Sequence, residues 1–145
     1  NNTSTILLLQ LDGKKLIFTG DAGTPALSAA ADLADAKGIP ITQPALFHVP
    51  HHGSKRNVGP AILNRFIGPP FTGVSSVGTT AMISAAKDGE PKHPSKRVTN
   101  ALNRRGATVA VTQGDAKLHF HNANSRGWRP CTPVPLSTTN DESDD

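Results

Sequence analysis

The chain of 145 residues is 36% hydrophobic, which is enough apolar material for the core of one modest domain. It holds no apolar run of the roughly 18 residues that a membrane-spanning helix needs, so no membrane segment is predicted. Aromatic residues make up only 4%, with no tyrosine, which argues against a stacking platform for single-stranded nucleic acid; the one cysteine, Cys131, excludes an intrachain disulfide framework and a cysteine-based zinc site.

The charge is unevenly distributed along the chain. The formal net charge is +4, and residues 141–145 hold four of the eleven acidic side chains. The rest of the chain therefore carries 15 basic and 7 acidic side chains, a net charge of +8. A chain with this charge is suited to bind a phosphate-rich or otherwise anionic partner such as nucleic acid. Alternatively, the basic surface serves solubility alone. Residues 1–4 do not resemble a signal peptide, so a cytoplasmic location is expected; the missing initiator methionine suggests a fragment.

Two strands joined by a tight turn are predicted first. Residues 5–11 are rich in leucine and β-branched side chains, Asp12-Gly13 is a strong hairpin signal, and residues 15–19 return antiparallel. The second strand ends in Gly20-Asp21, which places the Asp21 carboxylate at its C-terminal tip. An aspartate in this position serves either as a helix cap or turn residue, or as a ligand of a metal ion.

A helix and a third strand are predicted next. Thr24 suits the N-cap of a helix and Pro25 its first turn, and Gly38 is expected to end it. Residues 45–49 form a short apolar strand that stops at Pro50, because proline cannot continue a sheet ladder. The order strand, helix, strand predicts a crossover unit with its helix on one face of a sheet.

A pair of histidines, His51 and His52, follows this third strand on a turn. Loops at strand ends carry functional groups, and imidazole is a common metal ligand, although an exposed loop without function can show the same pair. Together with Asp21, the histidines form a mixed nitrogen and oxygen donor set that zinc or manganese accepts. Lys55 and Arg56 come next, either as contacts for a substrate phosphate or carboxylate or as solvated loop charges.

The second half of the chain is expected to continue the alternation of helices and strands. The sequence predicts a helix over residues 60–67, a strand over residues 71–77 and one or two helical turns over residues 80–87. A turn at residues 88–91 leads to His93-Pro94.

The C-terminal part is expected to hold one more helix and a closing hairpin. Ser95 suits the N-cap of the helix and Gly106 its end, while residues 107–112 and 116–121 would pair as strands. His119 and His121 would then share one face of the last strand, facing solvent or chelating a metal. Residues 1–121 are thus expected to form one domain, and residues 122–145 an irregular tail that is disordered from residue 133.

Several motifs, taken in order, resemble the metallo-β-lactamase fold. They are Asn2-x-Ser4, Phe18-Thr19-Gly20-Asp21, Val49-Pro50-His51-His52-Gly53-Ser54 and Lys92-His93-Pro94. More narrowly, they are similar to the branch that contains the hydrolase domain of DNA-uptake proteins of the ComEC/Rec2 type. The resemblance covers roughly residues 1–120. It departs from the family before His93, where Pro91-Lys92 stand in place of an aromatic residue and a glycine.

The resemblance implies an α/β fold that is the C-terminal half of an αββα sandwich, one mixed sheet with covering helices. The family's His-x-His-x-Asp-His signature lies in the N-terminal half, and no histidine precedes His48 here. A separate N-terminal half of the same fold would therefore be the partner of this chain.

The resemblance also implies roles for single residues. In the complete domain, two zinc or manganese ions would activate a water molecule. Asp21 would bridge the ions and His51 would ligate one of them, both as catalytic residues. His52 would be a further ligand or would act through its second ring nitrogen. Lys55 and Ser54 would contact the substrate, and His93 would either contact it or ligate a metal ion.

Three functions remain open at this point. The first is the C-terminal part of a metal-dependent hydrolase, acting on a phosphodiester or related ester and inactive without the N-terminal half. The second is a non-catalytic or regulatory module that keeps the fold and binds a partner. The third is a basic nucleic-acid-binding module, although the sequence holds no reading motif of the helix-turn-helix or RNP kind.

Overall fold

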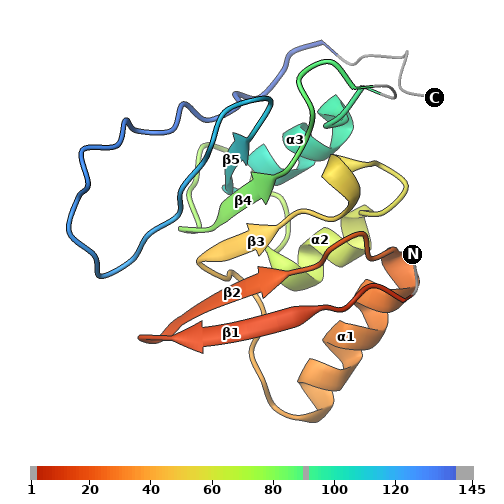
Figure 1. Cartoon of the computed structure of the whole chain (residues 1–145). Helices are drawn as coiled ribbons and strands as arrows, with labels where there is room; N and C mark the ends of the chain where they lie inside the picture. Colours follow the sequence, from red (N-terminus) through yellow and green to blue (C-terminus); the bar gives the residue numbers. More distant parts are fainter. Residues whose placement is uncertain (1–2, 90–91, 140–145) are drawn as a thin grey trace.

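One five-stranded sheet organises the computed structural model, which describes residues 3–89 and 92–139 (Figure 1). The strands lie side by side in chain order: β1 (Leu7–Leu11), β2 (Lys14–Phe18), β3 (Leu46–His48), β4 (Thr80–Ile83) and β5 (Thr108–Val111). β1 runs antiparallel to β2, and β2 to β5 run parallel to one another. The expected α/β class with one mixed sheet is confirmed. Asn2, part of the turn predicted at residues 88–91 and residues 140–145 of the tail lie outside the described residues.

The β1–β2 hairpin follows directly from its turn residues. Asp12 and Gly13 both adopt positive φ, 49° and 71°, as the two central residues of the twisted hairpin turn require. Leu11 consequently pairs with Lys14, and the register continues to Leu7 opposite Phe18. The predicted hairpin is confirmed; β1 is two residues shorter than predicted, and β2 has the predicted length but begins and ends one residue earlier.

Helix α1 (Thr24–Ala36) begins and ends close to the predicted residues. Its N-cap is Gly23 rather than Thr24, and Pro25 lies in the first turn. At the other end Gly38 takes a φ of 65°; its amide donates to the Asp35 carbonyl at 3.0 Å, and the Ile39 amide donates to the Ala34 carbonyl at 2.9 Å. This bonding pattern satisfies the last helical carbonyls and depends on a residue that tolerates the left-handed conformation.

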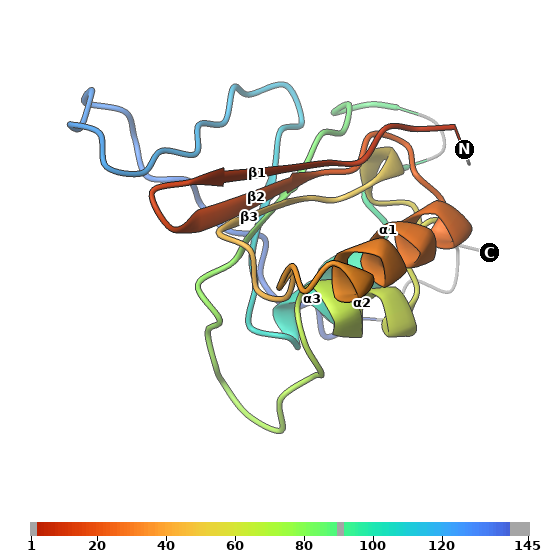
Figure 2. The same ribbon diagram turned by 90° about the horizontal axis from the view of Figure 1, so that it is seen from below.

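All three α-helices of the described residues cover the same face of the sheet (Figure 2). Helices α2 (Pro60–Phe66) and α3 (Lys96–Asn103) follow β3 and β4, so each crossover moves one strand along in the same direction. Right-handed crossovers of this kind place every helix on one side. The rings of Phe47 and Phe66 meet between the two layers, with centroids 5.4 Å apart. None of these helices has the length and apolar character to span a membrane.

The opposite face of the sheet is apolar, and no helix of the described residues lies on it. We call it the open face; because side chains alternate along a strand, it includes the apolar Leu7, Leu9, Leu11, Leu16, Phe18, Leu46 and Met82 together with the polar Lys14 and His48. The three leucines of β1 are 47%, 38% and 62% exposed. An exposed apolar face of this kind is typical of interaction surfaces.

Two predictions for the middle of the chain are wrong. Residues 71–77 are not a strand: their backbone bonds to the turn after α3, with the Phe71 amide donating to the Arg104 carbonyl at 2.8 Å and the Val77 amide to the Gly106 carbonyl at 3.1 Å. Residues 80–87 are not helical, because Thr80–Ile83 pair with β3 and β5 as β4. Hydrogen bonding to a strand on each side outweighs the weak helical preference of these residues.

The predicted closing hairpin is also wrong in its second strand. Residues 116–121 form no strand, and the edge of β5 instead receives the Val134 amide, which donates to the Val109 carbonyl at 2.9 Å. His119 and His121 therefore do not share a strand face. The Asn100 side chain bonds both the amide (2.8 Å) and the carbonyl (3.2 Å) of Ser137, which ties this part of the tail to α3.

We expect Leu102→Ala to lower the free energy of unfolding by about 2–5 kcal/mol, because Leu102 of α3 is fully buried against the sheet and its truncation leaves a cavity. The matched control Val74→Ala, at a fully exposed residue, should change it by less than about 0.5 kcal/mol. Urea denaturation followed by circular dichroism measures both. Equal stabilities for the two variants would contradict the described core.

Candidate functional site

Three loops meet at one edge of the sheet, where the parallel strands β2, β3 and β4 end. Asp21 follows β2, His51 and His52 follow β3, and Ser84 follows β4. His93 precedes α3. This edge is the usual location of sites in parallel α/β sheets, because it collects the loops that leave neighbouring strands.

The loop that carries Asp21 is held through its backbone. Thr19, fully buried, donates its hydroxyl to the His48 carbonyl at 2.7 Å. The buried Asn57 donates its amide to the carbonyls of Asp21 and Ala22 at 3.3 and 3.2 Å. The Asp21 side chain itself is exposed. Its carboxylate is thus presented to solvent from a fixed main chain.

The His51–Gly53 turn, η1, has an unusual backbone. His51, His52 and Gly53 take φ values of 47°, 56° and 79° in succession. Left-handed residues other than glycine are uncommon outside tight turns, and strained backbone of this kind clusters at functional sites. At Gly53 a side chain is excluded as well, since a Cβ atom would lie 2.7 Å from the Pro94 Cβ.

Two backbone hydrogen bonds connect this turn to the loops on either side. The His51 amide donates to the Gly20 carbonyl at 3.2 Å, which brings the turn next to the residue that precedes Asp21. The Ser95 amide donates to the Gly53 carbonyl at 3.1 Å, which brings the turn next to His93. The predicted site residues from three separate segments therefore lie in adjoining loops.

Three imidazoles gather in these loops. The ring centroids of His51 and His52 are 5.9 Å apart, and each lies 6.4 Å from that of His93. His52 Nδ1 is 2.6 Å from the Ser84 carbonyl oxygen. Because a carbonyl only accepts, Nδ1 carries the hydrogen, and in the neutral ring Nε2 of His52 has the lone pair. A ring held in this way is typical of a histidine that ligates a metal.

Sequence reasoning missed His48, which lies at the end of β3 on the open face. Its Nδ1 is 3.3 Å from the Thr19 hydroxyl, and its ring lies near Phe18 with centroids 6.5 Å apart. Burial lowers the pKa of His48; the Asp21 carboxylate opposes this change, and His52 adds to it. His48 therefore stays neutral at lower pH than an ordinary histidine, and its pKa depends on the charges of both Asp21 and His52.

Ser54 and Lys55 lie directly after η1. Ser54 is buried, and its hydroxyl oxygen accepts the Arg56 amide at 3.3 Å, so this hydroxyl stabilises the turn. Lys55 is half-buried beside it. Both residues flank the histidine turn, as expected from their position in the sequence.

The donor types suit zinc or manganese, but the set is incomplete. Within residues 3–89 and 92–139, no three His, Cys, Asp or Glu side chains are arranged to hold a metal ion. Asp21 with one or two imidazoles provides fewer donors than the four that a closed zinc site uses. A complete metal centre at this edge needs donors from elsewhere.

These features define an α/β chain with histidine-rich loops at the C-terminal edge of a parallel sheet. The chain is similar to ComE operon protein 3 of Bacillus subtilis (strain 168), with 27% identity over 127 residues. The matched region is 88% of this chain and 14% of that protein. No protein-family model matches the chain, and no solved structure matches it significantly. The metallo-β-lactamase assignment stays a prediction.

We expect Gly53→Ala to lower the free energy of unfolding by about 2 kcal/mol or more, because a Cβ at positive φ is strained and would collide with Pro94. Gly73→Ala is the control: Gly73 has open space around it and should change stability by less than about 1 kcal/mol. Chemical denaturation measures stability, and amide NMR spectra should show changes centred on residues 51–54 and 93–95. An unchanged Gly53→Ala protein would contradict the described contact between the two loops.

Proposed function

We propose that this chain is the C-terminal half of a metal-dependent hydrolase domain of the metallo-β-lactamase fold, similar to the ComEC type. The complete domain would act on a phosphodiester. The observation that carries the proposal is the meeting of the Asp21, His51 and His93 loops at one sheet edge through two backbone hydrogen bonds. The distant likeness to ComE operon protein 3 agrees with the same branch.

The open face supports the proposal that an N-terminal half completes the domain. In an αββα sandwich, each half is one sheet with helices on its outer side, and the two sheets meet through their inner faces. This chain has helices on one face and exposed leucines on the other. A second sheet laid on the open face would bury Leu7, Leu9 and Leu11 and would bring further metal donors to the shared edge.

Two divalent ions, zinc or manganese, would supply a water of lowered pKa and a Lewis acid for the substrate oxygen. On this chain, the Asp21 carboxylate would be one ligand and an imidazole of the His51-His52 pair another. The Ser84 carbonyl orients His52 for this role. His93 and Lys55 would position the scissile group beside them.

The charges around the site support an anionic substrate. Five cationic residues lie within four positions of His52 or His93 in the sequence: Lys55, Arg56, Lys92, Lys96 and Arg97. Basic groups that flank a metal centre bind the phosphates of a substrate such as nucleic acid.

One observation favours a second candidate, a non-catalytic module that keeps the fold and binds a partner. The described residues present no group of three metal donors. If the complete protein also lacks them, the loops at this edge would serve binding alone. A basic nucleic-acid-binding module is a special case of the same candidate.

We expect the chain by itself to bind Zn²⁺ weakly in calorimetric titration, because it offers few donors. Asp21→Ala and His51→Ala should each weaken binding by at least about tenfold. His121→Ala is the control, because His121 is exposed and its neighbour Asn122 bonds Asp12 at the opposite edge of the sheet. Equal affinity in all four proteins would refute the assigned ligands, whereas submicromolar affinity would refute the need for further donors.

In the complete protein, we expect metal-dependent hydrolysis of bis(p-nitrophenyl) phosphate to fall at least about a hundredfold in Asp21→Ala, because the ions lose a ligand. Lys55→Met should raise KM more than it lowers kcat, while Arg104→Met, at an exposed residue on the C-cap of α3, should change neither. Absence of hydrolysis, with salt-dependent DNA binding that persists in Asp21→Ala, would favour the binding module.

A further inference from the structure

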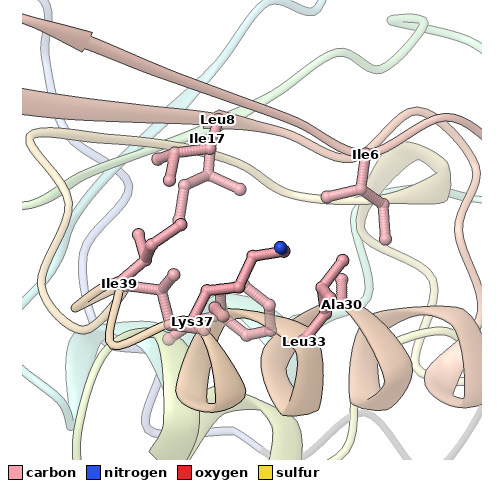
Figure 3. Close-up of a pocket in the computed structure, with 10 residues that line it drawn as sticks. Ile6, Leu8, Ile17, Ala30, Leu33, Lys37 and Ile39 are labelled. Atoms are coloured by element: carbon pink, nitrogen blue, oxygen red, sulfur yellow. The ribbon is translucent and has the colours of Figure 1, made fainter.

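A cavity of about 170 Å³ lies between the hairpin and α1, on the helix side of the sheet (Figure 3). Ile6, Leu8 and Ile17 line it on the sheet side, and Ala30 and Leu33 line it on the side of α1. Residues 39 and 41, which follow α1, and Phe66 of α2 also contribute to the lining. The cavity is therefore separate from the open face, on which an N-terminal half would dock.

Lys37 is the one charged residue among those that line the cavity. It is the C-cap of α1, and in Figure 3 its amine lies between the sheet-side residues and the helix-side residues. All the other lining residues are apolar. Both Lys37 and Leu33 are exposed, which leaves this side of the cavity accessible to solvent.

Size and chemistry together define a ligand class. An apolar cavity of about 150 Å³ stays dry and accepts a molecule as large as benzene, so this cavity accommodates one ring or a short acyl chain. A single ammonium group at the edge of such a cavity favours a ligand that ends in a carboxylate. An uncharged ligand would fill the same space without using Lys37.

We propose that this cavity binds a small carboxylate with an apolar body, a single ring or a short acyl chain, whose charge pairs with Lys37. The site does not depend on the proposed hydrolase. Asp21 precedes the first turn of α1 and Lys37 follows its last, which separates them by about 20 Å along 13 helical residues.

NMR titration of the chain with hexanoate tests the proposal, with hexanol as the uncharged probe. Hexanoate should shift the amide signals of α1, β1 and residues 39–41, and it should bind about fivefold more tightly than hexanol. Added NaCl should weaken hexanoate binding and leave hexanol binding unchanged, because salt screens an exposed ion pair.

Two variants and one control assign the contacts. Lys37→Met keeps the aliphatic stem, so it should remove the preference for hexanoate while hexanol still binds. Lys14→Met should keep the preference, because Lys14 lies on the other face of the sheet. Ala30→Leu adds volume in the cavity and should abolish binding of both probes, with thermal unfolding used to verify that the variant folds.

Equal affinity for the two probes, or an unchanged preference in Lys37→Met, would overturn the assignment of a carboxylate ligand. Unchanged binding to folded Ala30→Leu would overturn the cavity itself. Asp21→Ala should bind hexanoate normally, and Ala30→Leu should bind Zn²⁺ as the unaltered chain does. Failure of the cavity proposal is therefore distinguishable from failure of the proposed metal centre.

Discussion

The candidate site depends on two main-chain hydrogen bonds, from His51 to Gly20 and from Ser95 to Gly53. Parallel strands already deliver their C-terminal loops to one edge, so each bond only has to close a short remaining gap. Gly53 makes the second contact possible, because any side chain there would meet Pro94. The candidate site is therefore fixed by backbone geometry, while the Asp21 and His52 side chains remain exposed at this edge.

The sequence predicted those parts of the fold that local rules determine. Asp12-Gly13 specified the hairpin through its positive φ angles, and Gly38 specified the end of α1. β4 was not found, because its four residues become a strand only between β3 and β5, and no local pattern encodes two neighbours distant in sequence. The strand predicted for residues 116–121 does not form, because Val134 from the distant tail bonds the edge of β5 where a hairpin strand would have paired.

The candidate site shows the same division. Histidine and aspartate at strand ends were predictable, because residue type and the end of an apolar run are both visible in a sequence. The residues that support them were not. Thr19 reaches His48 across 29 positions, and Asn57 holds the Asp21 loop across 36. An isolated threonine or asparagine in a loop gives no signal of such a partner, so these roles emerge only from the folded chain.

The uncovered leucines of β1 have a practical consequence for work with the isolated chain. A flat array of aliphatic side chains in water lowers its free energy by meeting any similar array, including that of a second copy. The protein concentration then governs whether a sample stays monodisperse, and cooling weakens the association. Salts that strengthen apolar association will drive precipitation, and a detergent that coats the leucines will reverse it.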